Sequence, residues 1–194
     1  MAINDEALDI LFRGARTHNK WQDRKISPAL LMAIYDLLRW GPTAANSSPL
    51  RLVFVVSPQA KEKLKPHLAA GNVEKTMAAP ATAIIAYDLD FARQLGKLVP
   101  HNPAVAGWFA DAETARLTAF RSGSLQGAYF IVAARALGLD CGPMSGFDNA
   151  GVDREFFAGT AVKANFLCNI GYGDPSGVHP RAPRLSFDEA CRIV

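Results

Sequence analysis

Apolar residues in this chain occur either in short unbroken runs or in longer stretches mixed with polar residues. The runs at 51–57, 81–87 and 164–173 are short, apolar and rich in β-branched residues. Such runs are typical of strands buried on both faces. The longer stretches at 3–15, 27–42 and 112–137 predict helices. A further helix is expected to begin at Ser57-Pro58.

Capping residues mark the ends of several of these helices. Asn4 can cap the first helix, and Ser27 followed by Pro28 suits the start of the second. Gly41 and Pro42 suit its end. Ser186 and Glu189 have the spacing of a capping box, which predicts a short terminal helix.

Helices and strands alternate without internal repeats or linkers, which predicts one α+β domain over 1–194 with helices around one small sheet. Apolar residues make up 49% of the 194 residues, enough for a sizeable core. The long helix contains Gly123, Ser124, Gly127 and Ala128, which would permit the close approach of another helix.

Charge and cysteine content argue against several classes of protein. The net charge of +3 is too small to indicate nucleic acid or an anionic membrane as a partner. Cys141, Cys168 and Cys191 lack C-x-x-C spacing, which argues against a zinc site and favours a reducing compartment. The N-terminus is acidic and no run approaches the length of a membrane span, so we expect a soluble cytoplasmic protein.

An unusual loop, "GPTAANSSP", joins the second helix to the first strand at residues 41–49. It is longer than the common helix-to-strand connection of about two to six residues. The loop is either a plain connector or a holder of backbone amides and short polar side chains against a flat polar ligand.

Two basic clusters lie in irregular stretches of the chain. "RGARTHNKW" carries Arg13, Arg16, His18 and Lys20, and "HPRAPRL" carries His179, Arg181 and Arg184. Arginines beside a threonine hydroxyl suit a phosphate monoester. For either cluster alone, a solvated loop is favoured, because exposed Lys and Arg are common. No G-x-G-x-x-G or Walker sequence follows a strand, which disfavours a Rossmann site and a P-loop.

Two further segments contain candidate ligand groups. In "LDCGPMSGFD", Gly142-Pro143 predicts a turn, and Gly146 would allow the backbone to approach a ligand closely. In "GNVEKTMAAP", Asn72 and Lys75 are three residues apart and would share a helix face. Either segment could instead have a purely structural role.

Taken together, these segments resemble the flavin-dependent nitroreductase family across essentially the whole chain. The closest resemblance is to its malonic semialdehyde reductase branch, through "ARTHN", "WGPTAANSSP", "AFRSGSLQGAY", "ALGLDCGPMSGFD", "NIGYGD" and "PRLSFDEAC". The resemblance implies an α+β fold with a small central mixed sheet flanked by helices. It also implies an intertwined homodimer, with the helix around Gly123–Gly127 at the subunit interface and one FMN at each end of that interface.

Carried over by residue, the resemblance implies a cofactor site. It comprises Arg16, Thr17, His18, Lys20, Pro42, Thr43, Ala44, Asn46, Ser48, Asn72, Lys75, Met144, Ser145, Gly146 and Arg181. Arg16 and Arg181 would bind the phosphate, and Lys20 and Lys75 would lie near the flavin N1–O2 edge. The 42–48 loop, which is the central part of "GPTAANSSP", would come partly from the neighbouring subunit. His18 and Ser145 replace the Ser and Glu that many family members carry.

The implied activity is an NAD(P)H oxidoreductase in which hydride passes through flavin N5 in a ping-pong cycle, with malonic semialdehyde as the expected substrate. No side-chain acid is assigned. An amide at Ser145 or Gly146 would polarise N5, and Arg121 would either orient the substrate carboxylate or form an intersubunit ion pair. Two alternatives are a broad nitroaromatic or quinone reductase and a flavin-binding protein without turnover. The preference between NADH and NADPH cannot be read from these residues.

Overall fold

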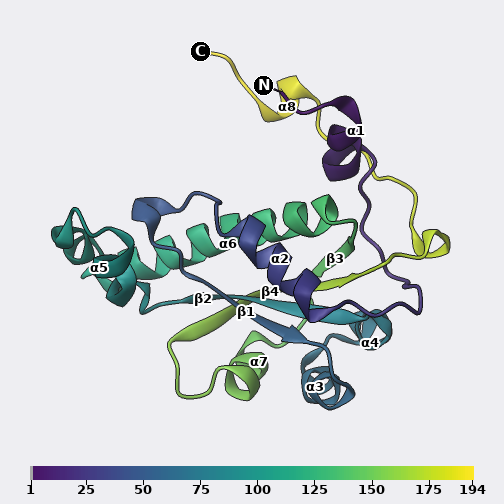
Figure 1. Ribbon diagram of the computed structural model, residues 1–194, viewed down its shortest axis with the longest axis horizontal. Coiled ribbons are helices and arrows are strands. Elements are labelled where there is room, and N and C mark those ends of the chain that lie inside the picture. Colours follow the sequence, from purple (N-terminus) through teal and green to yellow (C-terminus); the bar gives the residue numbers. More distant parts are fainter. Residues whose placement is uncertain (1) are drawn as a thin grey trace.

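A computed structural model describes residues 2–194, in which a four-stranded sheet lies between two helical layers (Figure 1). The strands are β1 (Leu50–Val55), β2 (Ala81–Asp88), β3 (Asp140–Met144) and β4 (Val162–Gly171), in the order β1-β2-β4-β3. Helices α2 (Pro28–Leu38) and α6 (Ala112–Ala136) cover one face. Helices α3 (Pro58–Leu64), α4 (Ala70–Ala78) and α7 (Asn149–Phe156) cover the other.

Shorter elements complete the chain. The helix expected over 3–15 consists of α1 (Asp5–Leu8) continued by a π-helical turn (Asp9–Arg13). The others are α5 (Leu95–Leu98), α8 (Phe187–Ala190) and 3₁₀ turns at Ala44–Asn46, Lys65–His67, Phe91–Gln94, Pro103–Phe109 and Pro175–Gly177. Among residues 2–194, no helix combines the length and apolarity needed to cross a membrane.

The sheet has a hydrophobic core on each face, and successive side chains along a strand point alternately into one core and the other. On β2, Ala83 and Ile85 join the core beneath α2 and α6, whereas Ile84 and Ala86 join the core beneath α3 and α7. All four side chains are fully buried, which confirms the expectation of a strand covered on both faces. A third, smaller core around Phe91 lies under the N-terminal end of α6.

The sheet differs from the expected one in strand direction. A mixed sheet was expected, but the pairings β1–β2, β2–β4 and β4–β3 are all antiparallel. A parallel contact occurs only as the isolated bridge Thr17–Cys141 at the edge, within the described part of the chain. The expected turn at Gly142-Pro143 was also wrong, because both residues lie within β3. This strand is at the sheet edge, where a proline without an N–H is tolerated.

The expected N-terminal helix caps are confirmed, whereas the second helix ends at Leu38, three residues before Gly41. Asn4 Oδ1 accepts from Ala7 N at 3.0 Å, and Ser27 Oγ accepts from Leu30 N at 3.2 Å. Ser186 and Glu189 form the capping box of α8. Local side-chain chemistry therefore sets these helix ends, as the sequence indicated.

Two of the small residues of α6 lie against strands of the same chain. A Cβ on Gly127 would lie 2.7 Å from Phe166 Cζ, and one on Gly123 would lie 2.9 Å from Tyr87 Cβ. Both glycines therefore bring α6 close to strands β2 and β4 of its own chain, not to another helix. Ala128 is exposed on the other side of the helix.

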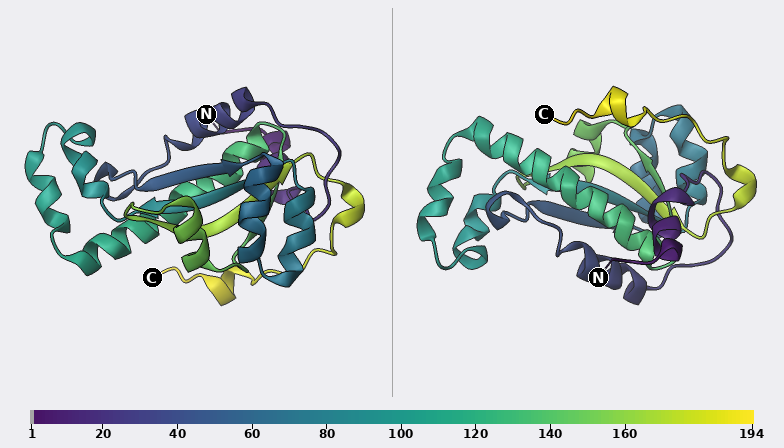
Figure 2. Two further views of the ribbon diagram at one scale, coloured as in Figure 1. Left: turned by 90° about the horizontal axis from the view of Figure 1, so that it is seen from below. Right: turned by 90° about the horizontal axis from the view of Figure 1, so that it is seen from above.

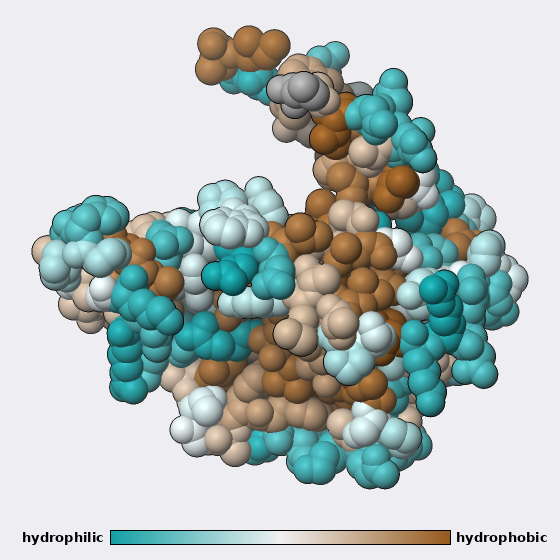
Figure 3. Space-filling model, in the orientation of Figure 1, coloured by the Kyte–Doolittle hydropathy of each residue, from teal (hydrophilic) through white to brown (hydrophobic). Residues whose placement is uncertain are grey.

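Helices α1 and α8 lie outside the layered body, and the second pair of views shows that they are apart from each other (Figure 2). Neither helix has a buried residue. Apolar side chains are exposed on the π-helical turn after α1, and on or directly beside α2 and α8 (Figure 3). They include Ile10, Phe12, Met32, Leu37, Trp40, Leu185 and Phe187.

Candidate functional site

The two basic clusters, 163 residues apart in sequence, meet around one cavity. It has a volume of about 540 Å³, and we call it the arginine cavity. Its lining includes Arg13, Arg16, Thr17, Arg135, Arg181 and Arg184. Guanidinium groups and a hydroxyl are the donors that bind a phosphate monoester.

Arginine–carbonyl bonds hold the two chain segments of this cavity together. Arg16 donates to the carbonyl of His179. Arg181 Nη2 donates to Arg13 O at 2.8 Å and to Ala15 O at 3.2 Å. Each guanidinium carries five N–H groups, so both retain donors for an anion.

A second cavity, of about 700 Å³, adjoins the first, and the two share Asn19 and His179. We call it the lysine cavity because Lys20 and Lys75 both line it. Glu74 and Asp174 also line it. The pKa of Asp174 lies below its usual value, mainly because the backbone N–H of Ser176 donates to its carboxylate.

Buried polar contacts fix α4, which carries Lys75. Trp21 Nε1 donates to Lys75 O at 3.1 Å. At the C-terminal end of the helix, the buried Lys61 ammonium donates to Thr76 O at 3.3 Å, to Met77 O at 3.0 Å and to Ala79 O. These carbonyls carry the negative end of the helix dipole. Burial lowers the pKa of Lys61.

Asn72 lies one turn earlier on α4 and is joined to the segment after β3. Its Nδ2 donates to Gly146 O at 2.8 Å, and a Cβ at 146 would lie 2.6 Å from that nitrogen. The close approach at Gly146 thus accommodates Asn72 of the same chain. Ser145 is exposed, whereas Met144 is buried with its sulfur 3.5 Å from the Thr76 hydroxyl.

The side chain of His18 is packed inward. It is buried, and its Nδ1 lies 3.3 Å from Asp140 Oδ1 without a hydrogen bond of good geometry. A Cβ on Gly173 would lie 2.2 Å from the ring. His18 lines neither the arginine nor the lysine cavity, so its expected contact with a cofactor remains a prediction.

The 42–48 loop lies at the opposite end of the sheet from α4 (Figure 1). It leads into Leu50, which begins β1, whereas α4 and the arginine cavity adjoin the far end. The six residues of β1 separate the two ends by roughly 20 Å. Within one chain, Pro42, Thr43, Ala44, Asn46 and Ser48 are therefore not brought to the other predicted site residues.

Some residues at these sites were not indicated by the sequence. Arg135, near the end of α6, lines the arginine cavity, and nothing in its local sequence sets it apart. Arg121, one of the predicted site residues, is exposed on this chain. A single chain therefore supplies no burial for its charge.

The Nitroreductase family model matches residues 12–172. The chain belongs to the nitroreductase family. Its relatives in this family include a protein of Stenotrophomonas maltophilia provisionally named NADH dehydrogenase/NAD(P)H nitroreductase, 60% identical over 100% of this chain and 98% of that one. A protein of the same provisional name from Cupriavidus pinatubonensis is 56% identical, with 98% of each chain covered.

Solved structures of the family share the fold. A provisionally assigned nitroreductase of Exiguobacterium sibiricum, solved in complex with FMN, matches with a TM-score of 0.88 at 20% identity, covering 100% of this chain and 99% of that one. Another from Bacillus subtilis matches with a TM-score of 0.86 at 21% identity, covering 98% and 100%. These similarities establish the α+β nitroreductase-like fold.

Proposed function

We propose that this protein is an FMN-dependent NAD(P)H oxidoreductase with one FMN-binding domain over 1–194. The observation that carries the proposal is the arginine cavity opening beside the lysine cavity. The first suits a terminal phosphate, and the second has the volume and cations for a flat, polar ring system. The provisional names of the relatives support the NAD(P)H-dependent activity.

The residues present fit FMN by the chemistry of their donor groups. FMN, when bound, supplies hydride transfer at its N5 and carries added negative charge along its N1–O2 edge. Arg16, Thr17 and Arg181 would hold the phosphate. Lys20 and Lys75 would stabilise negative charge on the ring edge. Ser145 and Gly146 would offer backbone amides beyond β3.

The proposal includes a homodimer in which a second copy supplies the 42–48 loop. The separation of roughly 20 Å within one chain supports this arrangement, because a single ring could not contact both sets of residues. Exposed apolar side chains on α2, on the π-helical turn after α1 and on α8 also suit a large subunit interface. Sedimentation at low micromolar concentration should show no monomer, and a monomer that retains FMN would contradict the shared site.

For the electron acceptor, we propose malonic semialdehyde, reduced to 3-hydroxypropionate. This proposal depends on the resemblance of "AFRSGSLQGAY" and its neighbouring segments, with exposed Arg121 as the cation for the substrate carboxylate. The provisional names of the relatives favour a second candidate, reduction of nitroaromatics or quinones. A cytoplasmic location completes the proposal.

The first experiment identifies the cofactor and tests turnover. Mass spectrometry of the heat-released cofactor should give FMN, and FAD or no flavin after reconstitution would contradict the proposal. Anaerobic addition of NADH or NADPH should bleach the flavin. A flavin that stays oxidised with both would indicate a carrier without turnover.

A second experiment assigns the acceptor. Stopped-flow reoxidation should be faster with malonic semialdehyde than with propanal at equal concentration. Arg121→Gln should remove most of that preference while leaving the FMN content unchanged. Rapid reoxidation by nitroaromatics without response to either aldehyde would select the second candidate.

A further inference from the structure

The 42–48 loop has an unusual backbone. Ala45, Asn46 and Ser48 have φ values of 50°, 52° and 42°. This left-handed region is unfavourable for residues with a Cβ, although asparagine tolerates it better than alanine or serine. Such conformations persist where the surroundings impose them, and they are concentrated at functional sites.

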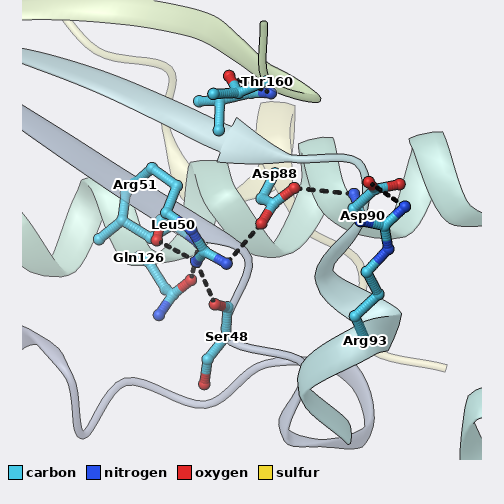
Figure 4. A network of polar contacts seen from close by, with 9 residues as sticks. Ser48, Leu50, Arg51, Asp88, Asp90, Arg93, Gln126 and Thr160 are labelled. Atoms are coloured by element: carbon cyan, nitrogen blue, oxygen red, sulfur yellow. Dashed lines mark hydrogen bonds and ion pairs between the residues drawn. The ribbon is translucent and has the colours of Figure 1, made fainter. Parts of the chain in front are cut away.

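Arg51, on β1, connects the strained end of this loop to the sheet (Figure 4). Its Nη1 donates to Ser48 O at 3.3 Å and to Leu50 O at 2.8 Å. Its Nη2 lies 2.6 Å from Asp88 Oδ2 on β2. The Asp88 side chain is only 15% exposed, so solvent screens this ion pair less than a surface pair.

Other contacts fix the surroundings of the loop. Gln126 Oε1 on α6 accepts from Leu50 N at 3.0 Å, and Asp88 Oδ1 accepts from Asp90 N at 2.8 Å. A cavity of about 340 Å³ opens at this point, and its lining includes Asn46, Ser48, Arg51 and Gln126. The shape of the loop thus determines the shape of a cavity wall.

We infer that Arg51, paired with Asp88, is a positioning residue that holds the left-handed 42–48 loop in the conformation needed for turnover. This inference rests on the proposed function, in which the loop completes the flavin site of a second copy. The planar guanidinium can reach two carbonyls and one carboxylate together, whereas an ammonium has no such fixed fork. Arg51 would act through Ser48 and contact neither cofactor nor substrate.

The chain offers a matched control for this ion pair. Arg93 and Asp90 form a pair at 3.0 Å within the Asp88–Arg93 segment, but the Arg93 side chain is 79% exposed and bonds no loop carbonyl. Arg51→Met and Arg93→Met therefore remove comparable cations, but only the first removes contacts to the loop. Arg51→Lys retains the positive charge but loses the planar set of N–H donors that reaches two carbonyls and a carboxylate together.

The test measures amide hydrogen exchange across 42–49, FMN content and the kcat/KM for an electron acceptor. Arg51→Met should raise exchange about tenfold at the Ser48 amide, whose bond to Thr43 Oγ1 depends on the loop shape. It should also lower kcat/KM about tenfold or more while retaining FMN, since orientation is lost. Arg51→Lys should give intermediate values, and Arg93→Met should stay within about twofold of wild type.

Unchanged exchange in Arg51→Met would overturn the inference, as would faster exchange with wild-type kcat/KM. A wild-type protein without FMN or NAD(P)H oxidation would instead overturn the proposed function. In that case, hydrogen exchange would still decide whether Arg51 holds the loop. If Arg51→Met unfolds, Asp88→Asn removes the charge that orients the Arg51 guanidinium, and it should raise exchange at the Ser48 amide in the same direction by a smaller factor.

Discussion

The contact between α6 and the sheet provides a sharp test of the packing. Gly127→Ala would place a Cβ 2.7 Å from Phe166 Cε1 and Cζ and 3.1 Å from Ile85 Cγ2. Carbon atoms pack best at about 3.5–4.0 Å. Moving the helix away from the sheet would open the neighbouring contact at Gly123, where α6 lies against Tyr87.

Two opposing effects set the expected change in the free energy of unfolding. Alanine should stabilise the helix interior by about 1 kcal/mol relative to glycine. Overpacking against a rigid ring costs about 1–3 kcal/mol. Here the cost is raised because Phe166 on β4 and Ile85 on β2 must both shift. We therefore expect a net loss of about 1 kcal/mol, which lowers Tm by about 2–4 °C for a domain of this size.

Thermal and urea unfolding measure this change at fixed protein and FMN concentrations, because ligand and subunit binding both shift the apparent stability. Phe166→Leu removes the ring atoms nearest the new methyl group. The double mutant should therefore lose less stability than the sum of the single mutants. Gly96→Ala is the control, since nothing lies within 4 Å of its added Cβ. A Gly127→Ala protein more stable than wild type, or strict additivity with Phe166→Leu, would refute the packing argument.

Three further predictions concern the cofactor and the helix caps. Arg181→Ala should weaken FMN binding by about 1.5–3 kcal/mol, the scale of a hydrogen bond to a charged group, and titration of apoprotein checks this. Lys20→Met should lower the flavin reduction potential, because positive charge near the ring edge is lost; an unchanged potential in a dye-linked measurement would exclude that role. Hydrogen bonds from Thr114 lower the pKa of Asp111, so its stabilising contribution is present above the unfolded pKa of about 3.9 and disappears as pH falls through the folded value. Asp111→Asn should keep the cap and remove this contribution to the loss of stability as pH falls below the unfolded pKa.

The sequence by itself determined the features that depend on neighbouring residues. Caps at Asn4, Ser27 and Ser186 lie where a side-chain oxygen can reach an amide within one turn. The runs that became β1, β2 and β4 could also be read locally, because a strand buried on both faces needs apolar residues throughout. The composition of the arginine clusters led to the hypothesis of a phosphate site, which stays a prediction.

Only the tertiary structure decided which distant groups meet. Strand β3 could not be recognised from Gly142-Pro143, because a proline is compatible with a strand only when that strand is at the sheet edge. The glycines of α6 have the spacing of a close contact, but the folded chain places strands against them and not a helix. The bonds from Arg51 to Ser48 and Asp88 likewise arise when β1 and β2 pair. Spacing along a chain fixes which side chains share a face, whereas the partner of that face is set by packing of the whole core.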